Sequence, residues 1–536
     1  MLGEFIKYDP ENKSGYEDLV LEVCGLQYRK QASGFAVVVP PLNAGSSVDD
    51  HPDEAEFESA YSKLSEEEQK RLCCFLLFPA EAEIKKREII HCWIGMRFMD
   101  SMDAEHLLAK FVSVGLIERT FLYKKILNRY RMPISVRSCL LGRQTNPLAQ
   151  IKNDGSWSIL HHQKMGNLDE TEPMRRSLLR RMTMVGSPPP DPSAISDGNT
   201  DPEALLNVSQ TTLNAARFKT MSGMEKLRVV HLGRWHQDSK EYIVVEDIEA
   251  FKYLRNLSNV AFLSLEGVSG IVKLPESVYD LRLLKVLDLR ACNNLETLPP
   301  GIKSLDLTIL DLSGCYLLDH VPLGITSLTN LQQLKGFVIN NDQLQQKPNG
   351  RTKRKTKEKG KRTAASSPCS FGELSKLEKL RKLTILTRKM NFPTPQDFET
   401  LCELENLSCL RITWVGNSTT EVPPDSDDLG MFPSSLEKLE LQAAPNPIAS
   451  RLLSLISQDT ENCGLEKLYL RGGGLRELKH FFPQPTIVRL RYLPQLQINW
   501  DDFIKLFPNL KRLEVLGCPN LALFPCDENG IWENTQ

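Results

Sequence analysis

The most regular feature of this sequence is a spacing of apolar residues between Leu284 and Ile325 that recurs after 23 positions. In each unit a leucine–any–leucine triplet alternates apolar and polar positions, as expected of a short strand with one buried face. One unit cannot bury its own leucines, so neighbouring units have to stack and pair their strands in parallel. The matched positions are Leu284, Leu287, Leu289, Cys292, Leu295, Leu298 and Pro299, then Leu307, Leu310, Leu312, Cys315, Leu318, Val321 and Pro322.

This spacing is the signature of leucine-rich repeats, and it predicts an α/β solenoid with a parallel sheet on its concave side. Similar but less regular units place the repeat domain over residues 222–526, followed by a tail at residues 527–536. An insertion at residues 345–370 interrupts the array with a strongly basic run. The other strand phrases contain Val230, Leu263, Leu334, Leu383, Leu410, Leu439, Leu468, Val488 and Leu513.

Residues 61–140 have helical spacing instead. Ser65 followed by three glutamates is a capping box that starts a first helix. A second helix is predicted from Glu83 to about Met99, and a third from near Asp103 to around Gly115. Leu116 to Met132 reads as two strands. Three helices and a hairpin predict a small winged-helix domain in front of the solenoid.

The segment YSKLSEEEQKRLCCFLLFPAEAEIKKREIIHCWIGMRFM resembles the winged-helix segment of plant intracellular immune receptors, the nucleotide-binding (NB-ARC) leucine-rich-repeat proteins. A second phrase, LLAKFVSVGLIER, resembles the next motif of that family, and the two motifs occur in family order. The resemblance implies a disease-resistance protein. The matching residues are Leu64, Cys74, Phe75, Leu76, Phe78, Pro79, Ile84, Ile89, Ile90, Trp93, Ile94 and Phe98, then Leu108, Phe111, Leu116 and Ile117.

The sequence departs from the family where nucleotide is bound. The family ends this domain with Met-His-Asp, whose histidine lies near the nucleotide phosphates, but this chain has Met132, Pro133 and Ile134. No G-x-x-x-x-G-K-[ST] phosphate loop occurs in the sequence. We therefore expect a truncated receptor, with the winged helix and repeats but without the phosphate-loop domain, and no cofactor.

The remaining segments are less informative. Residues 1–60 are an N-terminal segment of uncertain structure, and residues 141–221 read as a linker and the start of the repeat array. Lys347 to Arg362 is typical of a solvated loop, with nuclear localisation or polyanion binding as alternatives. No run approaches 18 apolar residues, so we expect no membrane insertion.

Catalytic and metal sites are not expected. The adjacent pairs Cys73-Cys74, His91-Cys92 and His161-His162 have no partners at the spacing of metal ligands. No G-x-S-x-G nucleophile motif occurs, so we expect that the protein is not an enzyme. Three of the thirteen cysteines, Cys292, Cys315 and Cys518, fall at repeat positions where burial explains them.

We expect the binding surface on the concave sheet, where successive strands place their outward side chains next to one another. Arginine and aromatic residues at such positions are typical of interface hot spots, although exposed arginines also simply solvate a surface. The predicted protein-binding residues are Arg290, Arg411, Trp414, Tyr469, Arg471, Arg489 and Arg491.

The predicted function is protein recognition in plant defence. The partner would be a pathogen effector, a guarded host protein, or a nucleotide-binding receptor chain that supplies the missing switch. The alternative is a nuclear adaptor that binds nucleic acid through the basic loop and the winged helix. The third helix of that domain, which would contact the nucleic acid, carries one lysine, Lys110, against the acids Asp103 and Glu105. Nucleic acid is therefore the weaker expectation. We expect a cytoplasmic protein, with nuclear localisation left open.

Overall fold

A computed structural model of the chain describes most of its length, in two compact units, Met1–Ala55 and Glu56–Gln536. The basic run Lys347–Arg362 lies outside the described residues. The described residues are 20–23, 26–31, 34–38, 54–80, 82–98, 104–122, 125–142, 150–153, 157–161, 202–208, 211–235, 242–340, 367–389, 391–416, 432–458 and 464–534.

The first unit contains a small antiparallel sheet in the order β1-β2-β3. Its strands are β1 (Val20–Val23), β2 (Leu26–Gln31) and β3 (Gly34–Val38). The sequence analysis left residues 1–60 uncertain, and these three strands lie within that segment.

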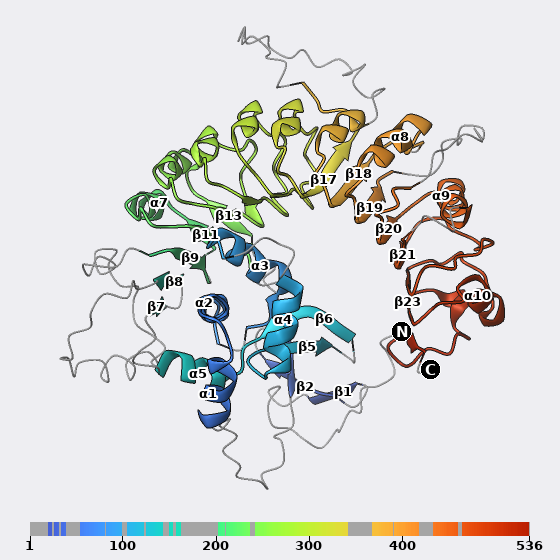
Figure 1. Cartoon of the computed structure of the whole chain (residues 1–536), viewed down its shortest axis with the longest axis horizontal. Helices are drawn as coiled ribbons and strands as arrows, with labels where there is room; N and C mark the ends of the chain where they lie inside the picture. Colours follow the sequence, from blue (N-terminus) through green and yellow to red (C-terminus); the bar gives the residue numbers. More distant parts are fainter. Residues whose placement is uncertain are drawn as a thin grey trace, which may run out of the picture. The chain divides into compact units, whose positions relative to one another are not determined.

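The second unit begins with a helical region, residues 56–142, in which the predicted helices and hairpin occur in the predicted order (Figure 1). Its classification as a winged-helix domain stays a prediction. The elements are α1 (Glu54–Ser62), α2 (Glu66–Cys73), η1 (Cys74–Leu77), β4 (Ile84–Lys85), α3 (Lys86–Gly95), α4 (Ala104–Ser113), β5 (Glu118–Leu122), β6 (Lys125–Arg131) and α5 (Ile134–Gly142).

Two helix starts in this region show how local sequence sets the boundaries. The Ser65 hydroxyl accepts a hydrogen bond from the Glu68 backbone N–H, and the Glu68 carboxylate accepts one from the Ser65 N–H. This is the predicted capping box. Helix α3 begins at Lys86 rather than at the predicted Glu83, because Ile84 and Lys85 pair with β6 as a short strand.

The repeats build one long sheet, in which the strands from β9 to β23 pair in parallel. The short strands β10, β12 and β14 are not part of it. Antiparallel strands close the two ends: β7 and β8 before β9, and β24 after β23. The bounds are β7 (Gln150–Asn153), β8 (Trp157–His161), β9 (Ala204–Asn207), β11 (Val229–His231), β13 (Phe262–Ser264), β15 (Val286–Asp288), β16 (Ile309–Asp311), β17 (Gln333–Ile339), β18 (Lys382–Thr387), β19 (Cys409–Trp414), β20 (Lys438–Gln442), β21 (Lys467–Arg471), β22 (Ile487–Arg491), β23 (Arg512–Leu516) and β24 (Ile531–Glu533).

Helices lie on the opposite side of the repeats from this sheet (Figure 1). A second, small parallel sheet is formed by β10 (Thr212–Leu213), β12 (Ile243–Val245) and β14 (Val268–Ser269). The helices are α7 (Ala215–Met221), η3 (Ile248–Asn256), η4 (Glu276–Asp280), η5 (Pro300–Ser304), η6 (Leu323–Ser327), η9 (Phe371–Lys376), α8 (Pro395–Glu403), α9 (Asn446–Gln458), α10 (Trp500–Leu506) and η10 (Pro519–Leu521).

The repeat core forms because equivalent leucines stack from strand to strand. Leu287 pairs in register with Leu263 on one side and Leu310 on the other, and all three are fully buried. Burying one leucine contributes about 1.5–3 kcal/mol, so the stack accounts for much of the stability. The cysteines cap the turns: the Cys292 thiol donates to the Leu265 carbonyl at 3.1 Å. The α/β leucine-rich-repeat solenoid predicted from the sequence is confirmed.

A left-handed residue recurs at one position of the repeat, two residues after the second inward apolar residue of the strand. Glycine adopts this conformation without the steric cost that a side chain meets there. Two repeats place alanine there, and one places Tyr492, which has φ of 54°. The position is occupied by Gly267, Ala291, Gly314, Ala443, Gly472, Tyr492 and Gly517.

Candidate protein-binding face

Side chains that point away from the repeat core form columns across the sheet, because the strands pair in register. One column contains Val229, Phe262, Val286, Ile309, Gln333, Lys382, Cys409, Lys438, Lys467, Ile487 and Arg512. The next contains His231, Ser264, Asp288, Asp311, Lys335, Thr384, Arg411, Glu440, Tyr469, Arg489 and Glu514.

These columns divide the sheet into two faces. We call the outward side chains of β11, β13, β15 and β16 the covered face, because the helical region packs on them. Its apolar members share one buried cluster with Trp93 and the rest of the helical region: Val229, Phe262, Val286 and Ile309. We call the outward side chains of β18 to β23 the open face.

Helix α3 lies directly on the covered face. A Cβ atom at Gly95 would lie 2.7 Å from the Phe262 Cβ, so only glycine permits this approach. The Glu88 carboxylate is fully buried and lies 3.1 Å from His231 Nε2. Arg87 pairs with both Glu88 and Glu266. The helical region and the repeats are therefore joined by apolar packing and by a buried charge network.

The environment of this network shifts the pKa values of its members in opposite directions. Burial raises the pKa of Glu88, but Arg87 and the hydrogen bond from His231 outweigh it and hold that pKa well below its usual range. Burial lowers the pKa of His91 to about 3, so the imidazole is neutral at neutral pH. Burial raises the pKa of Asp288, and the neighbouring Glu266 and Asp311 add to the rise.

Glu88, His91 and Asp288 also bring possible metal-ligand atoms within 4.8 Å of one another. The sequence did not predict this group, because Asp288 is brought to helix α3 only by the fold. Glu88 is already engaged by Arg87 and His231. The structure thus provides an ion-pair explanation for these side chains, and we assign no metal to them.

Arg290 belongs to the covered side of the sheet. Its Nε lies 3.8 Å from the Glu266 carboxylate, in the same network as Arg87. Its Nε and Nη2 atoms are buried, with no hydrogen-bond acceptor among the described residues. The structure therefore separates Arg290 from the other predicted binding residues, because helix α3 occupies this part of the concave sheet.

The expectation that Trp414 faces outward is wrong. Along strand β19, from Cys409 to Trp414, half-buried and buried side chains alternate without interruption. Trp414 therefore points to the same side as Leu410 and Ile412. Its side chain is 3% exposed, and its indole N–H donates to the Phe392 carbonyl at 3.2 Å. Trp414 is therefore a core residue, on the side of β19 that is opposite to the open face.

The other five predicted residues do lie together on the open face. Tyr469 and Arg489 are direct neighbours, since β21 and β22 pair them in register, and so are Arg471 and Arg491. Arg411 lies two strands before Tyr469, with Glu440 between them. Arg411 Nη2 donates to Glu440 at 2.7 Å, and Arg489 and Arg491 both donate to Glu514.

Tyrosine rings support these cations. The Lys438 ammonium and the Arg489 guanidinium lie 4.3 and 4.2 Å from the centre of the Tyr469 ring. Arg471 lies over Tyr492. The strand pattern places Tyr492 outward, but the predicted binding residues did not include it. One sequence alone does not reveal the left-handed turn that brings its ring to Arg471.

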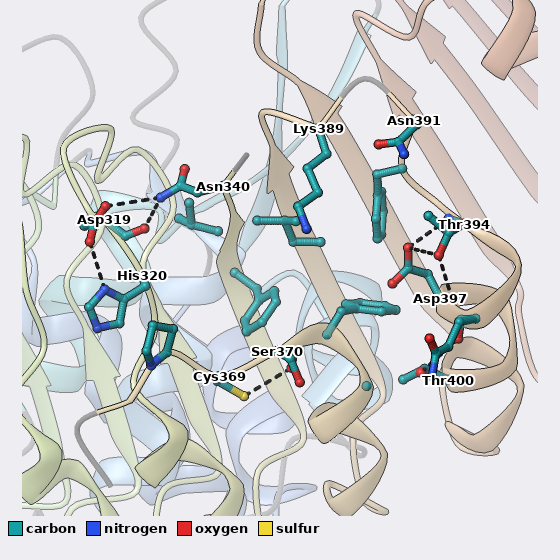
Figure 2. A pocket seen from close by; sticks show the side chains of 18 residues that line it. Asp319, His320, Asn340, Cys369, Ser370, Lys389, Asn391, Thr394, Asp397 and Thr400 are labelled. Carbon is teal, nitrogen blue, oxygen red and sulfur yellow. Dashed lines mark hydrogen bonds and ion pairs between the residues drawn. The ribbon is translucent and has the colours of Figure 1, made fainter. Parts of the chain in front are cut away.

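The sequence analysis also missed a pocket of about 450 Å³ beside strand β17. Its apolar lining includes Phe337, Phe371 and Phe392, with Phe371 and Phe392 edge to face at 5.3 Å. Figure 2 shows the polar side chains around it, where His320 contacts Asp319 and the Asp397 carboxylate accepts hydrogen bonds from the Thr394 backbone N–H and hydroxyl. These polar groups satisfy one another, and nothing in the arrangement selects a ligand.

Within the part of the chain that the structure describes, no helix has the length and apolar character needed to span a bilayer.

Comparison with known proteins supports the repeat fold. Residues 206–349 match the family described as leucine-rich repeat region. The chain is 21% identical over 507 residues to Disease resistance RPP13-like protein 4 of Arabidopsis thaliana. The aligned part covers 89% of this chain and 52% of that protein, so the chain spans about half the length of this curated relative.

Similar solved structures are also repeat proteins. A leucine-rich-repeat protein of Leptospira interrogans is 20% identical, with 56% of this chain and 63% of that chain covered and a TM-score of 0.32. The ectodomain of the Arabidopsis receptor kinase HAESA, in complex with a peptide hormone, is 16% identical, with 57% and 44% covered and a TM-score of 0.28. The strand register and the family match, rather than these two likenesses, establish that the chain carries a leucine-rich-repeat domain. Over most of its own length the chain is similar to a plant disease-resistance protein.

Proposed function

We propose that this chain is a protein-recognition module of plant defence, and that the open face is where its partner binds. The partner is a pathogen effector, a guarded host protein or a nucleotide-binding receptor chain. The observation that carries the proposal is the arrangement of Arg411, Tyr469, Arg471, Arg489 and Arg491 on one sheet surface. Arginine and tyrosine are the residue types that dominate interface hot spots. The similarity to a disease-resistance protein supports the biological setting.

The role is binding rather than catalysis. The residues of the open face are cations, tyrosines and two buried carboxylates that the cations already engage. This chemistry suits a protein surface, since it offers charge, hydrogen-bond donors and rigid aromatic area without an activated nucleophile. We place the protein in the cytoplasm, where the partners named above would be met.

The alternative role is nucleic-acid binding through the helical region and the basic loop, of which the loop lies outside the described residues. Three basic residues of the helical region lie in ion pairs, and two of these are Lys110 with Glu68 at 2.6 Å and Arg129 with Glu83 at 2.9 Å. Arg131 pairs with Glu118 at 2.8 Å. Cations that are already neutralised release fewer counterions on binding a phosphate backbone, and so contribute less affinity.

The test is partner capture with matched variants of the full chain. Proteins labelled by proximity in plant tissue would be identified for the natural chain, for Tyr469→Ala/Arg471→Ala/Arg491→Ala, and for Lys303→Ala/Lys505→Ala. The control lysines are exposed on η5 and α10, on the opposite side of the repeats. We expect the affinity of at least one captured and purified partner to fall at least tenfold for the first variant, and to stay unchanged for the lysine variant. Equal binding of that partner to all three chains would remove the open face as the site.

A further inference from the structure

The open face carries a strong excess of positive charge. Among the outward side chains of β18 to β23, eight are basic and two are acidic. The whole chain, by contrast, has a net charge of −2. The charge is therefore concentrated on this surface. The basic residues are Lys382, Arg411, Lys438, Lys467, Arg471, Arg489, Arg491 and Arg512, and the acids are Glu440 and Glu514.

The two acids cannot neutralise this excess. Glu440 is shared by Arg411 and Lys438, at 2.7 and 3.4 Å. Glu514 is shared by three arginines of β22 and β23, Arg489, Arg491 and Arg512. Burial raises the pKa of Glu440, but its two cations outweigh it and the pKa is lowered, so the carboxylate is already ionised at neutral pH. Two acids outside this set also pair with its cations, Glu466 with Lys467 and Glu533 with Arg512. Eight cations thus face four acids, and the remaining positive charge is available to an anion from outside.

Arg471 is the most exposed cation of β21 to β23. Its side chain is exposed, and it has no ion pair among the described residues. The Tyr492 ring lies under its guanidinium at 5.6 Å and limits the directions it can take. A cation that is held in place before binding loses less conformational entropy when a carboxylate arrives.

Apolar side chains lie among these cations. Tyr492 is 50% exposed and Leu516 is 43% exposed, both at the strand ends next to Arg471 and Arg491. A partner that matches this surface therefore needs carboxylates together with an apolar residue. Protein segments combine the two within a few residues.

Nucleic acid matches the surface less well. Successive bases stack on successive aromatic rings, but Lys438 and Arg489 already lie over the Tyr469 ring, which leaves Tyr492 as a single exposed ring beside Arg471. The buried acids Glu440 and Glu514 also interrupt the cations along the strands, which disfavours a continuous phosphate backbone and suits separate carboxylates.

The chain itself provides one example of an acid near this surface. Glu105 of α4 hydrogen-bonds to Lys86, which lowers the pKa of Glu105, and Lys382 and Lys467 contribute to the same lowering. These two lysines thus act electrostatically on an acid of the helical region. Further along, Arg471 makes no ion pair among the described residues, and Arg491 shares Glu514 with Arg489 and Arg512.

We propose that the open face at β21 to β23 binds an acidic segment of a protein partner, with its carboxylates on Arg471 and Arg491 and an apolar side chain against Tyr492 and Leu516. The proposal rests on the function proposed above and specifies the chemistry of the partner.

The experiment selects ligands without assuming a sequence. Random dodecamer peptides would be displayed to the full chain, to Arg471→Gln/Arg491→Gln, and to the control Lys303→Gln/Lys505→Gln. Enriched peptides, and a single-stranded oligothymidine of equal length, would then be titrated by fluorescence anisotropy at two salt concentrations. Arg471→Gln alone is the second variant, because that side chain makes no described ion pair whose loss would disturb folding.

We expect the enriched peptides to carry an excess of Asp and Glu next to an apolar residue. Their Kd should rise at least tenfold in the double variant and severalfold in Arg471→Gln, with no change in the control. Neutral peptides that still depend on Arg471 and Arg491 would overturn the acidic chemistry but keep the proposed function. Peptides that bind all variants equally, or no enrichment, would remove the face itself. Tighter binding of oligothymidine would replace the acidic segment by nucleic acid.

Discussion

The covered and open faces occupy the same columns of one sheet but have opposite chemistry. In the first column, Val229, Phe262, Val286 and Ile309 lie under the helical region, and Lys382, Lys438, Lys467 and Arg512 replace them on the open face. Outward positions of a solvated sheet are normally polar. The four successive apolar residues therefore mark the strands that another part of the chain covers. On the open face the same column is mainly basic, with Cys409 and Ile487 as exceptions, and we propose that a partner covers those strands.

Charge is also used differently on the two faces. Where α3 packs on the covered face, buried acids pair across distant parts of the chain: Glu88 with His231, and Glu266 with Arg87. On the open face the ion pairs join neighbouring strands and remain partly exposed. Buried pairs are costly to break, whereas exposed pairs contribute little. The comparison predicts that equal substitutions on the two faces have unequal effects.

The largest difference is expected between Arg87→Met and Arg471→Met. Arg87→Met leaves Glu88 and Glu266 without their main cation and should weaken the contact between helix α3 and the sheet by about 3–5 kcal/mol. Arg471→Met should change stability by no more than about 0.5 kcal/mol. Hydrogen exchange of peptides from α3 and β13 measures the contact. Similar exchange in both variants would contradict the buried network.

Strand β19 allows the same comparison between the inside and outside of one strand. Trp414→Ala should destabilise the repeats by at least about 3 kcal/mol, because it opens a cavity and leaves the Phe392 carbonyl without its donor. The control Thr413→Ala, at the half-buried outward position beside it, should cost less than about 1 kcal/mol. Urea unfolding followed by circular dichroism measures both. A loss of less than about 1 kcal/mol in Trp414→Ala would contradict the buried position of Trp414 and agree with the outward position predicted from the sequence.

The pH dependence of the covered face should follow His91. Its pKa is about 3 in the folded chain, against an ordinary value of 6.5, because burial disfavours the charged form. As pH falls below 6.5 the unfolded chain gains a proton that the folded chain does not, so folding weakens between pH 6.5 and 3. The loss approaches about 1.4 kcal/mol per pH unit.

The matched variant is His91→Phe, which keeps a ring against Phe262. The raised pKa of Asp288 acts with the opposite sign, since its protonation stabilises the folded form as pH falls. The quantity to compare is therefore the change in the free energy of unfolding with pH, in the natural chain and in His91→Phe. Chemical unfolding at pH 7, 6 and 5 should show His91→Phe losing less stability on acidification. Parallel losses in both chains would mean that His91 is protonated in the folded state.

The smallest effects are expected at the left-handed turn position. Gly472→Ala should cost about 1 kcal/mol, since φ is 62° although a Cβ atom there has no neighbour closer than 3.9 Å. Ala443→Gly, at the same position of the preceding repeat, should be neutral or stabilising by less than about 1 kcal/mol. Thermal unfolding should show a lower Tm for Gly472→Ala and an equal or higher Tm for Ala443→Gly, if the backbone conformation rather than packing determines the change in stability.

Local patterns in the sequence were sufficient for the repeats and for the helices before them. The alternation around Leu287 and Leu310 and the capping box at Ser65 depend on neighbours within a few residues, and the structure confirms them. The same alternation, extended along the six residues of β19, would have placed Trp414 inside. That error came from treating the strand as a leucine–any–leucine triplet.

The covered face could not be predicted in the same way. The contact between Arg87 and Glu266 joins residues 179 positions apart, and the pattern around each one is satisfied without the other. Arg290 was grouped with the open-face arginines for this reason. The open face itself was predicted from its arginines and tyrosine, but the turn that brings Tyr492 beneath Arg471 depends on a backbone conformation.

That turn links three consecutive repeats. The Tyr492 ring lies under Arg471 of the repeat before it. A Cβ atom at Gly517, in the repeat after it, would lie 2.7 Å from the Tyr492 Cδ1 atom. A side chain gained at residue 517 would thus displace the ring, and a displaced ring would release the arginine. Substitutions on this surface are therefore expected to covary between adjacent repeats. In related chains, changes at residues 471, 492 and 517 should occur together.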